Sequence, residues 1–130
     1  MKSGEFIYAK THAEFLNKSF GTNYKSWMKC VWNYSDDLIV WMVRFDKNIN
    51  GWRNTFVSDS RIKEENLDNV AIWDGKTVET AMEIHKNRLV IEIIDLGHIR
   101  KYVFRGRFIY DRENSNPRTV RFHDKIDDQF

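Results

Sequence analysis

The 130-residue sequence predicts a β-rich α+β domain, in which a bent sheet or partly closed β-barrel of six to eight mostly antiparallel strands carries an N-terminal helix. Two observations support this fold class. Short apolar or alternating segments, separated by turn residues, recur along the chain. Clear helix signals are confined to one segment near the N-terminus. The length is that of one ordinary domain, so we expect residues 1–130 to share a single core.

The predicted helix covers His12 to Phe20. Thr11 and Glu14 match a capping box at its start, and Gly21 stands where a C-terminal cap is expected. Apolar residues in between share one face, so the helix should pack against the sheet.

The strands are predicted from apolar alternation and β-branched or aromatic enrichment. The first two should form a hairpin through residues 35–37. A short surface helix, capped by Ser58 or Asp59, is expected over residues 58–66. Residues 70–73 should be extended, whereas residues 77–85 fit either a helix or a strand, with the strand favoured. The predicted strands are Ser26 to Tyr34, Leu38 to Phe45, Trp52 to Val57, Arg88 to Ile94, Lys101 to Tyr110 and Arg118 to His123.

Composition excludes several classes of function. The net charge is only +2, from 21 basic and 19 acidic residues, so the chain is not a polybasic protein that coats nucleic acid. Cys30 is the single cysteine, and the four histidines follow no metal-binding spacing, so we expect no metal and no cofactor. No apolar run reaches membrane-spanning length. We therefore expect a cytoplasmic protein without membrane contact.

A basic cluster surrounds the segment Lys101 to Tyr110. Strand alternation places its aromatic residues on one face and Lys101, Arg105 and Arg107 on the other. Antiparallel pairing through the 112–117 loop would bring Arg105 and Arg107 near Arg118 and Arg121. Such a patch would hold phosphate groups. The alternative is that carboxylates neutralise these arginines on a solvated face; the carboxylates considered are Glu79, Glu83, Glu92 and Asp111.

A second cluster combines indoles with polar side chains. Trp41 and Arg44 lie in one predicted strand, and Trp52, Arg53 and Asn54 follow a glycine at the start of the next. Tryptophan supplies a stacking face for a base, and arginine or asparagine can read the edge of that base.

Two further tryptophans, Trp27 and Trp73, are additional stacking candidates. The alternative for Arg44 is structural, with its guanidinium buried against a carboxylate such as Glu64 or Glu65.

Catalytic motifs are missing. Neither a phosphate-binding glycine loop nor the spacing of a metal-dependent nuclease occurs, so we name no catalytic residue. Two alternatives remain open. One is a small metal-independent ribonuclease that uses His98 and His123 as an acid/base pair. The other is a protein-interaction module, such as a phage or bacterial inhibitor, which would bind a protein partner through exposed aromatic residues.

The segments WMVRF, GWRN and YVFRGRF, within the expected barrel, resemble the PUA-like group, which includes ASCH, EVE and SRA-type domains. The resemblance implies a pocket between barrel strands, where an aromatic side chain stacks on a base that is often flipped from the duplex. We therefore expect noncatalytic binding of a nucleotide-containing ligand, either a nucleic acid, with or without a modified base, or a small nucleotide signal. The sequence does not define an oligomeric state.

Overall fold

The computed structural model describes residues 1–69 and 84–130. The expectations for residues 70–73 and 77–83, including the stacking role of Trp73, lie outside this part of the chain. The elements are β1 (Phe6–Ala9), α1 (His12–Phe20), β2 (Val31–Ser35), β3 (Leu38–Val43), β4 (Asn48–Ile49), β5 (Trp52–Ser58), β6 (Arg61–Asn66), β7 (Asn87–Asp95), β8 (Arg100–Tyr110) and β9 (Val120–Asp127).

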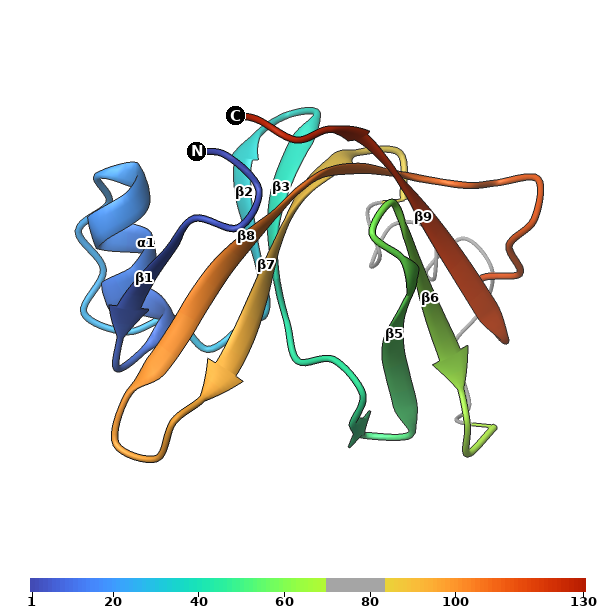
Figure 1. The fold of residues 1–130 in the computed structure, drawn as a ribbon, viewed down its shortest axis with the longest axis horizontal. Helices are drawn as coiled ribbons and strands as arrows, with labels where there is room; N and C mark the ends of the chain where they lie inside the picture. Colours follow the sequence, from blue (N-terminus) through green and yellow to red (C-terminus); the bar gives the residue numbers. More distant parts are fainter. Residues whose placement is uncertain (70–83) are drawn as a thin grey trace.

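These strands form one curled sheet in the order β2-β3-β7-β8-β9-β6-β5-β4, with β1 paired to β8. Among the described strands, β3 and β7 run parallel and the other neighbours run antiparallel. Beyond β3, the backbone N–H of Asp46 donates to the carbonyl of Asn54 in β5 at 2.8 Å. The two ends of the sheet therefore approach each other, which confirms the predicted partly closed barrel (Figure 1).

The central strand β3 is buried on both faces. Leu38, Val40 and Met42 pack against the side that carries α1, which we call the outer face. Trp41 and Val43 point to the barrel interior, which we call the inner face. Burial on both faces explains the unbroken apolar run of this strand.

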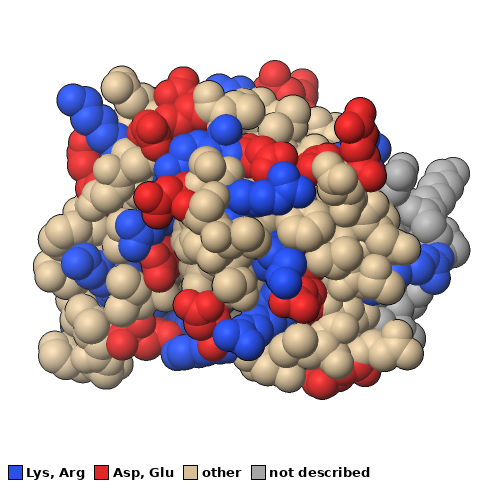
Figure 2. All heavy atoms as spheres, turned by 45° about the vertical axis from the view of Figure 1, so that its right-hand side comes forward, with Lys and Arg blue, Asp and Glu red and all other residues tan. Residues whose placement is uncertain are grey.

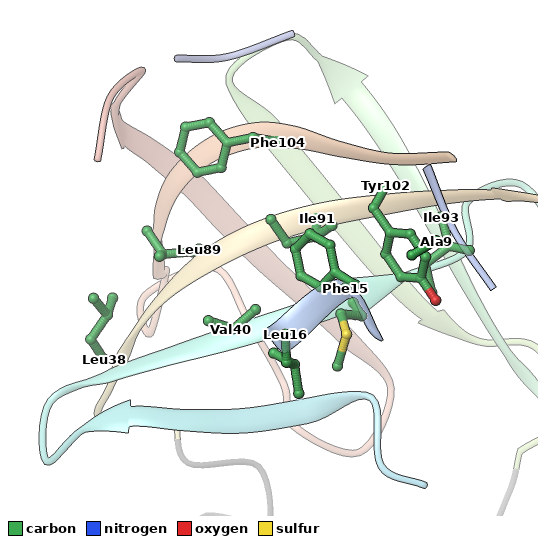
Figure 3. Packing of buried hydrophobic residues seen from close by; sticks show 11 residues of the cluster. Ala9, Phe15, Leu16, Leu38, Val40, Leu89, Ile91, Ile93, Tyr102 and Phe104 are labelled. Carbon is green, nitrogen blue, oxygen red and sulfur yellow. The ribbon is translucent and has the colours of Figure 1, made fainter. Parts of the chain in front are cut away.

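The helix α1 covers the outer face. Its Phe15 ring stacks on Tyr102 of β8 at a centroid distance of 4.6 Å, and Leu16 is fully buried beside it (Figure 3). Thr11 Oγ1 accepts a hydrogen bond from the Glu14 N–H, and Gly21 ends the helix at φ +69°. The predicted bounds and caps of this helix are confirmed.

A smaller apolar cluster fills one end of the barrel interior. Phe45 stacks on Phe56 of β5 at a centroid distance of 4.3 Å, and Ile62, Val90 and Phe108 are buried beside them. The other end of the interior carries polar side chains and forms the candidate site.

A β-bulge divides β8 into two halves. Val90 lies opposite Gly106, whereas the next residue of β7, Ile91, lies opposite Phe104, so Arg105 is an additional residue on β8. Tyr102 and Phe104 consequently belong to the outer cluster, and Phe108 belongs to the inner one. Gly106 adopts φ +120°, and a Cβ at this position would lie 2.8 Å from the carbonyl oxygen of Asp127.

Two predicted elements differ in the structure. The strand expected from Ser26 begins only at Val31, because residues 26–30 form a loop. The short helix expected over residues 58–66 is wrong, since a turn leads into the strand β6. Its alternating residues pair with β5 and β9 on either side, and this pairing outweighs the helical preference of its polar residues. No helix among the described residues is long and apolar enough to cross a membrane.

Candidate functional site

Three polar side chains lie side by side on the inner face. The strand register places Asn54 of β5 opposite Glu64 of β6, and Glu64 opposite Arg121 of β9. Directly opposed residues in adjacent strands project from the same face of a sheet. A carboxamide, a carboxylate and a guanidinium therefore form a row across three strands.

The centre of this row is buried. Glu64 is 8% exposed, and its Oε2 lies 3.6 Å from the Arg121 guanidinium. Its Oε1 lies 2.5 Å from Nε2 of His123, which is 0% exposed. The Arg121 guanidinium also covers the Trp52 ring at 3.9 Å and donates to the carbonyl of Pro117 at 2.7 Å.

The electrostatics of the site favour an ionised carboxylate beside a neutral imidazole. Burial lowers the pKa of His123, against the opposing effect of Glu64. Burial alone would raise the pKa of Glu64, but the hydrogen bond from His123 and the charges of Arg121 and Arg88 lower it overall. Nε2 of His123 thus carries the proton that it donates to Glu64, and Nδ1 presents a lone pair.

Three buried polar atoms at the site make no hydrogen bond in the structure. They are Oδ1 of Asn54, Nδ1 of His123 and the hydroxyl of Tyr110. Buried polar atoms are nearly always hydrogen-bonded, so atoms of this kind indicate a water or a ligand group that completes them. Aromatic rings flank the imidazole, since the ring centroids of Trp41 and Tyr110 lie 5.0 and 5.6 Å from that of His123.

Of the predicted indole and arginine cluster, the structure brings Trp41, Trp52 and Asn54 to the inner face. Arg53 alternates with Trp52 and Asn54, so its exposed side chain lies on the opposite face of β5. Arg44 is paired with Asp95 at 2.7 Å. A carboxylate thus pairs with Arg44, as the structural alternative expected, but it is Asp95 rather than Glu64 or Glu65.

The predicted basic patch does not assemble. Arg105 donates to Glu92 at 2.6 and 2.8 Å, whereas Arg107 lies opposite Leu89 of the outer cluster. The bulge in β8 is the physical reason, because one additional residue reverses the alternation. Arg118 is exposed, and Arg121 points inward at Glu64. Glu92 thus pairs with Arg105, as the alternative interpretation expected, whereas Arg121 pairs with Glu64, a buried carboxylate that this interpretation did not include.

The surface carries the same mixture of charge. Figure 2 shows acidic and basic side chains interspersed over one face of the molecule rather than a uniform basic area. Trp27, a further stacking candidate, packs against the outer cluster and is remote from the inner polar row.

The predicted histidine pair is wrong as well. His98 lies in the loop that precedes β8, whereas His123 lies opposite Tyr110 at the far end of that strand. Ten residues of strand separate these positions, which corresponds to roughly 30 Å along an extended chain. The two histidines cannot act together on one scissile bond.

Sequence reasoning missed Glu64, His123 and Tyr110 as members of one site. The signal for Glu64 was present in the alternation of RIKEEN, where Ile62 and Glu64 share a face. His123 was considered only as a partner of His98, and Tyr110 only as a core residue.

Comparisons with known proteins agree with this architecture. The model of the SRA family, the SET and RING associated domain, matches residues 2–130. The chain therefore belongs to the SRA family, a PUA-like family whose domains bind DNA containing modified cytosine.

A solved structure, described as "The 5-Hydroxymethylcytosine-Specific Restriction Enzyme AbaSI", shares the fold with a TM-score of 0.71 at 20% sequence identity. The match covers 94% of this chain but only 39% of that enzyme. Among curated proteins, none matches significantly.

Proposed function

We propose that this SRA domain binds DNA that carries a modified cytosine and holds that base, flipped out of the duplex, on the inner polar row of the barrel. Family membership supports the class of ligand. The observation that carries the proposal is the row of Asn54, Glu64 and Arg121, which is buried at its centre and in which the buried Oδ1 of Asn54 makes no hydrogen bond.

The row is complementary to the Watson–Crick edge of cytosine. The exocyclic amino group of cytosine donates two hydrogen bonds, and Asn54 Oδ1 and the Glu64 carboxylate are acceptors. The ring nitrogen N3 and the O2 carbonyl of cytosine are acceptors, and Arg121 is a donor. Thymine presents a carbonyl in place of the amino group. This carbonyl and the Glu64 carboxylate are both hydrogen-bond acceptors, so they would repel each other.

The aromatic side chains supply stacking surfaces for the same base. Trp52 lies beside the row, under the Arg121 guanidinium, and Trp41 and Tyr110 flank His123. A base inside a duplex cannot reach these side chains, so the nucleotide must rotate out of the helix. Enclosure between aromatic rings compensates for the stacking that the base loses.

His123 extends the proposal to the substituent at C5 of the base. Its buried Nδ1 carries a lone pair, and no group in the structure donates a hydrogen bond to it. The hydroxyl of a 5-hydroxymethyl group can donate to it, whereas a 5-methyl group cannot. We therefore expect 5-hydroxymethylcytosine to bind more tightly than 5-methylcytosine.

Fluorescence anisotropy with duplexes that differ at one base tests this function. The bases are cytosine, 5-methylcytosine and 5-hydroxymethylcytosine, and the variants are Asn54→Leu and its neighbour Thr55→Val, which lies on the opposite face of β5. One well-placed base contact discriminates by about 1–3 kcal/mol, or roughly fivefold or more in affinity. The wild type and Thr55→Val should prefer a modified duplex, and Asn54→Leu should bind all three weakly and alike. Equal wild-type affinity for the three duplexes would reject the proposal.

The protein-interaction alternative stays a prediction. Several large apolar side chains are exposed, including Met28 at 91% and Tyr34 at 47%. A stable complex with a protein, together with no binding to any of the three duplexes, would favour that alternative.

A further inference from the structure

A second group of charged side chains lies on the outer face, outside the inner polar row. Asp95, at the end of β7, accepts two hydrogen bonds from Arg44 at 2.7 and 3.2 Å. Its Oδ1 also lies 3.4 Å from Nε of Arg100, the first residue of β8. One carboxylate thus pairs with two guanidiniums.

The charges of this group do not cancel. Arg44 and Arg100 contribute two positive charges and Asp95 one negative charge, which leaves a single excess positive charge. Apart from the bonds to Asp95 and a contact of 3.4 Å between Arg100 Nη1 and the Tyr102 hydroxyl, the described residues provide no partner for either guanidinium.

The pKa of His12, the first residue of α1, shows the effect of this positive potential. His12 Nδ1 lies 2.8 Å from the Tyr102 hydroxyl, the same oxygen that Arg100 approaches. Burial, and then the charges of Arg100 and Arg44, lower the pKa of His12 from 6.5 to about 4. Two guanidiniums that repel a proton from a neighbouring imidazole also attract an anion.

The group lies at the same end of the molecule as Trp52, which borders the inner polar row. Figure 1 shows the β7–β8 hairpin tip, the loop after β3 and the start of β5 at the same lower end of the molecule. Trp52 begins β5 there, and residues 45–51 alone separate it in sequence from Arg44. A duplex lying across this end could place one base against Trp52 and a backbone phosphate against the two arginines.

We infer that Arg44 and Arg100, held together by Asp95, form a contact for one backbone phosphate of DNA, separate from the base-binding residues. The chemistry is that of a phosphodiester, because one excess positive charge is matched by one negative charge and free guanidinium N–H groups suit phosphate oxygens. The inference rests on the proposed function for the identity of the ligand as DNA, but it does not depend on a modified base.

The test is the salt dependence of binding to an unmodified duplex and to one with 5-hydroxymethylcytosine. Each neutralised phosphate contributes about 0.9 to the slope of log K against log salt concentration. Arg100→Gln should therefore lower the magnitude of the slope by up to about 0.9 on both duplexes. Asp95→Asn, which removes the negative charge and keeps a hydrogen-bond acceptor, should change affinity and slope in the opposite direction.

Arg61→Gln is the matched control. Arg61 lies by the β5–β6 turn and is paired with two carboxylates, Asp111 at 3.1 Å and Asp124 at 2.9 Å, so it has no excess positive charge to offer. The slope of log K against log salt concentration for Arg61→Gln should equal that of the wild type.

Wild-type slopes in both Arg100→Gln and Asp95→Asn would overturn the phosphate contact, whatever the preference for modified bases. Conversely, the expected slopes without any preference for a modified base would reject the proposed function and retain the phosphate contact. A duplex that the wild type does not bind at any salt concentration would reject both.

Discussion

The carboxylate of Glu64 accepts a hydrogen bond of 2.5 Å from Nε2 of His123, inside the barrel and away from solvent. The bond fixes the imidazole as the neutral tautomer protonated at Nε2, and it holds the carboxylate next to Asn54. It also leaves Nδ1 as a bare acceptor. One buried pair therefore defines both the charge and the hydrogen-bonding pattern that a flipped base would meet.

Removal of His123 alone should destabilise the fold strongly. His123→Leu leaves a buried carboxylate oxygen without its hydrogen-bond donor, and such a loss typically costs about 1–3 kcal/mol, or more when the group left behind is charged. In a Glu64→Gln background no carboxylate charge is left to be stabilised. His123→Leu should therefore lower the free energy of unfolding by less in that background than in the wild type. Urea unfolding of the four proteins of this double-mutant cycle measures the coupling. Purely additive costs would show that the pair does not act as a unit.

Stability should also fall with acidification, through His12. Its pKa is lowered from 6.5 to about 4 by burial and by Arg100 and Arg44. Between these values the unfolded chain binds a proton that the native state excludes, so the free energy of unfolding decreases as the pH falls from 6.5 towards 4. One titrating proton limits this slope to about 1.4 kcal/mol per pH unit, and partial exposure of His12 lowers it further.

The variant His12→Gln removes this titration. Urea unfolding at about pH 7 and about pH 5 should show a smaller loss of stability in the variant than in the wild type. The pKa of His123 is lowered too, so some pH dependence should persist. An identical loss in both proteins would contradict the role of His12.

The helix and the central strands were predictable because their signals are local. The caps at Thr11 and Gly21 determine where α1 begins and ends, and burial on both faces shows directly in the apolar run of β3. The orientation of Arg105 and Arg107 was not predictable in the same way. It depends on a bulge, which arises from pairing with residues distant in sequence.

That bulge gives a separate prediction. Gly106→Ala should destabilise the protein by about 1–3 kcal/mol or more, because φ +120° is strained for any other residue and the new Cβ would meet a backbone carbonyl. Gly97→Ala is the matched control, with φ +91° but no atom within 4 Å of its Cβ.

Thermal unfolding should rank wild type, then Gly97→Ala, then Gly106→Ala in order of decreasing stability. Equal losses in the two variants would mean that backbone strain alone, rather than close packing of β8 on β9, requires glycine at position 106.

The inner polar row illustrates the second limit of the sequence. Charged residues such as Glu64 are usually exposed, so five charged or polar residues among the six of β6 favoured a surface helix. Its partners, the His123 imidazole and the Arg121 guanidinium, explain why a carboxylate is tolerated inside the barrel. Trp41, Trp52, Asn54 and Arg121 were recognisable as residue types, whereas their convergence with Glu64 and His123 required the fold.

Fluorescence of 2-aminopurine next to the modified base tests the central claim most directly, because its emission rises when a neighbouring base leaves the stack. In a duplex with a single 5-hydroxymethylcytosine, wild-type protein should increase this emission, and Trp52→Ala should abolish the increase by removing a stacking surface. Trp32→Phe, on the outer cluster, should behave like the wild type. Binding with no increase in emission, or an increase that Trp52→Ala leaves intact, would contradict the account.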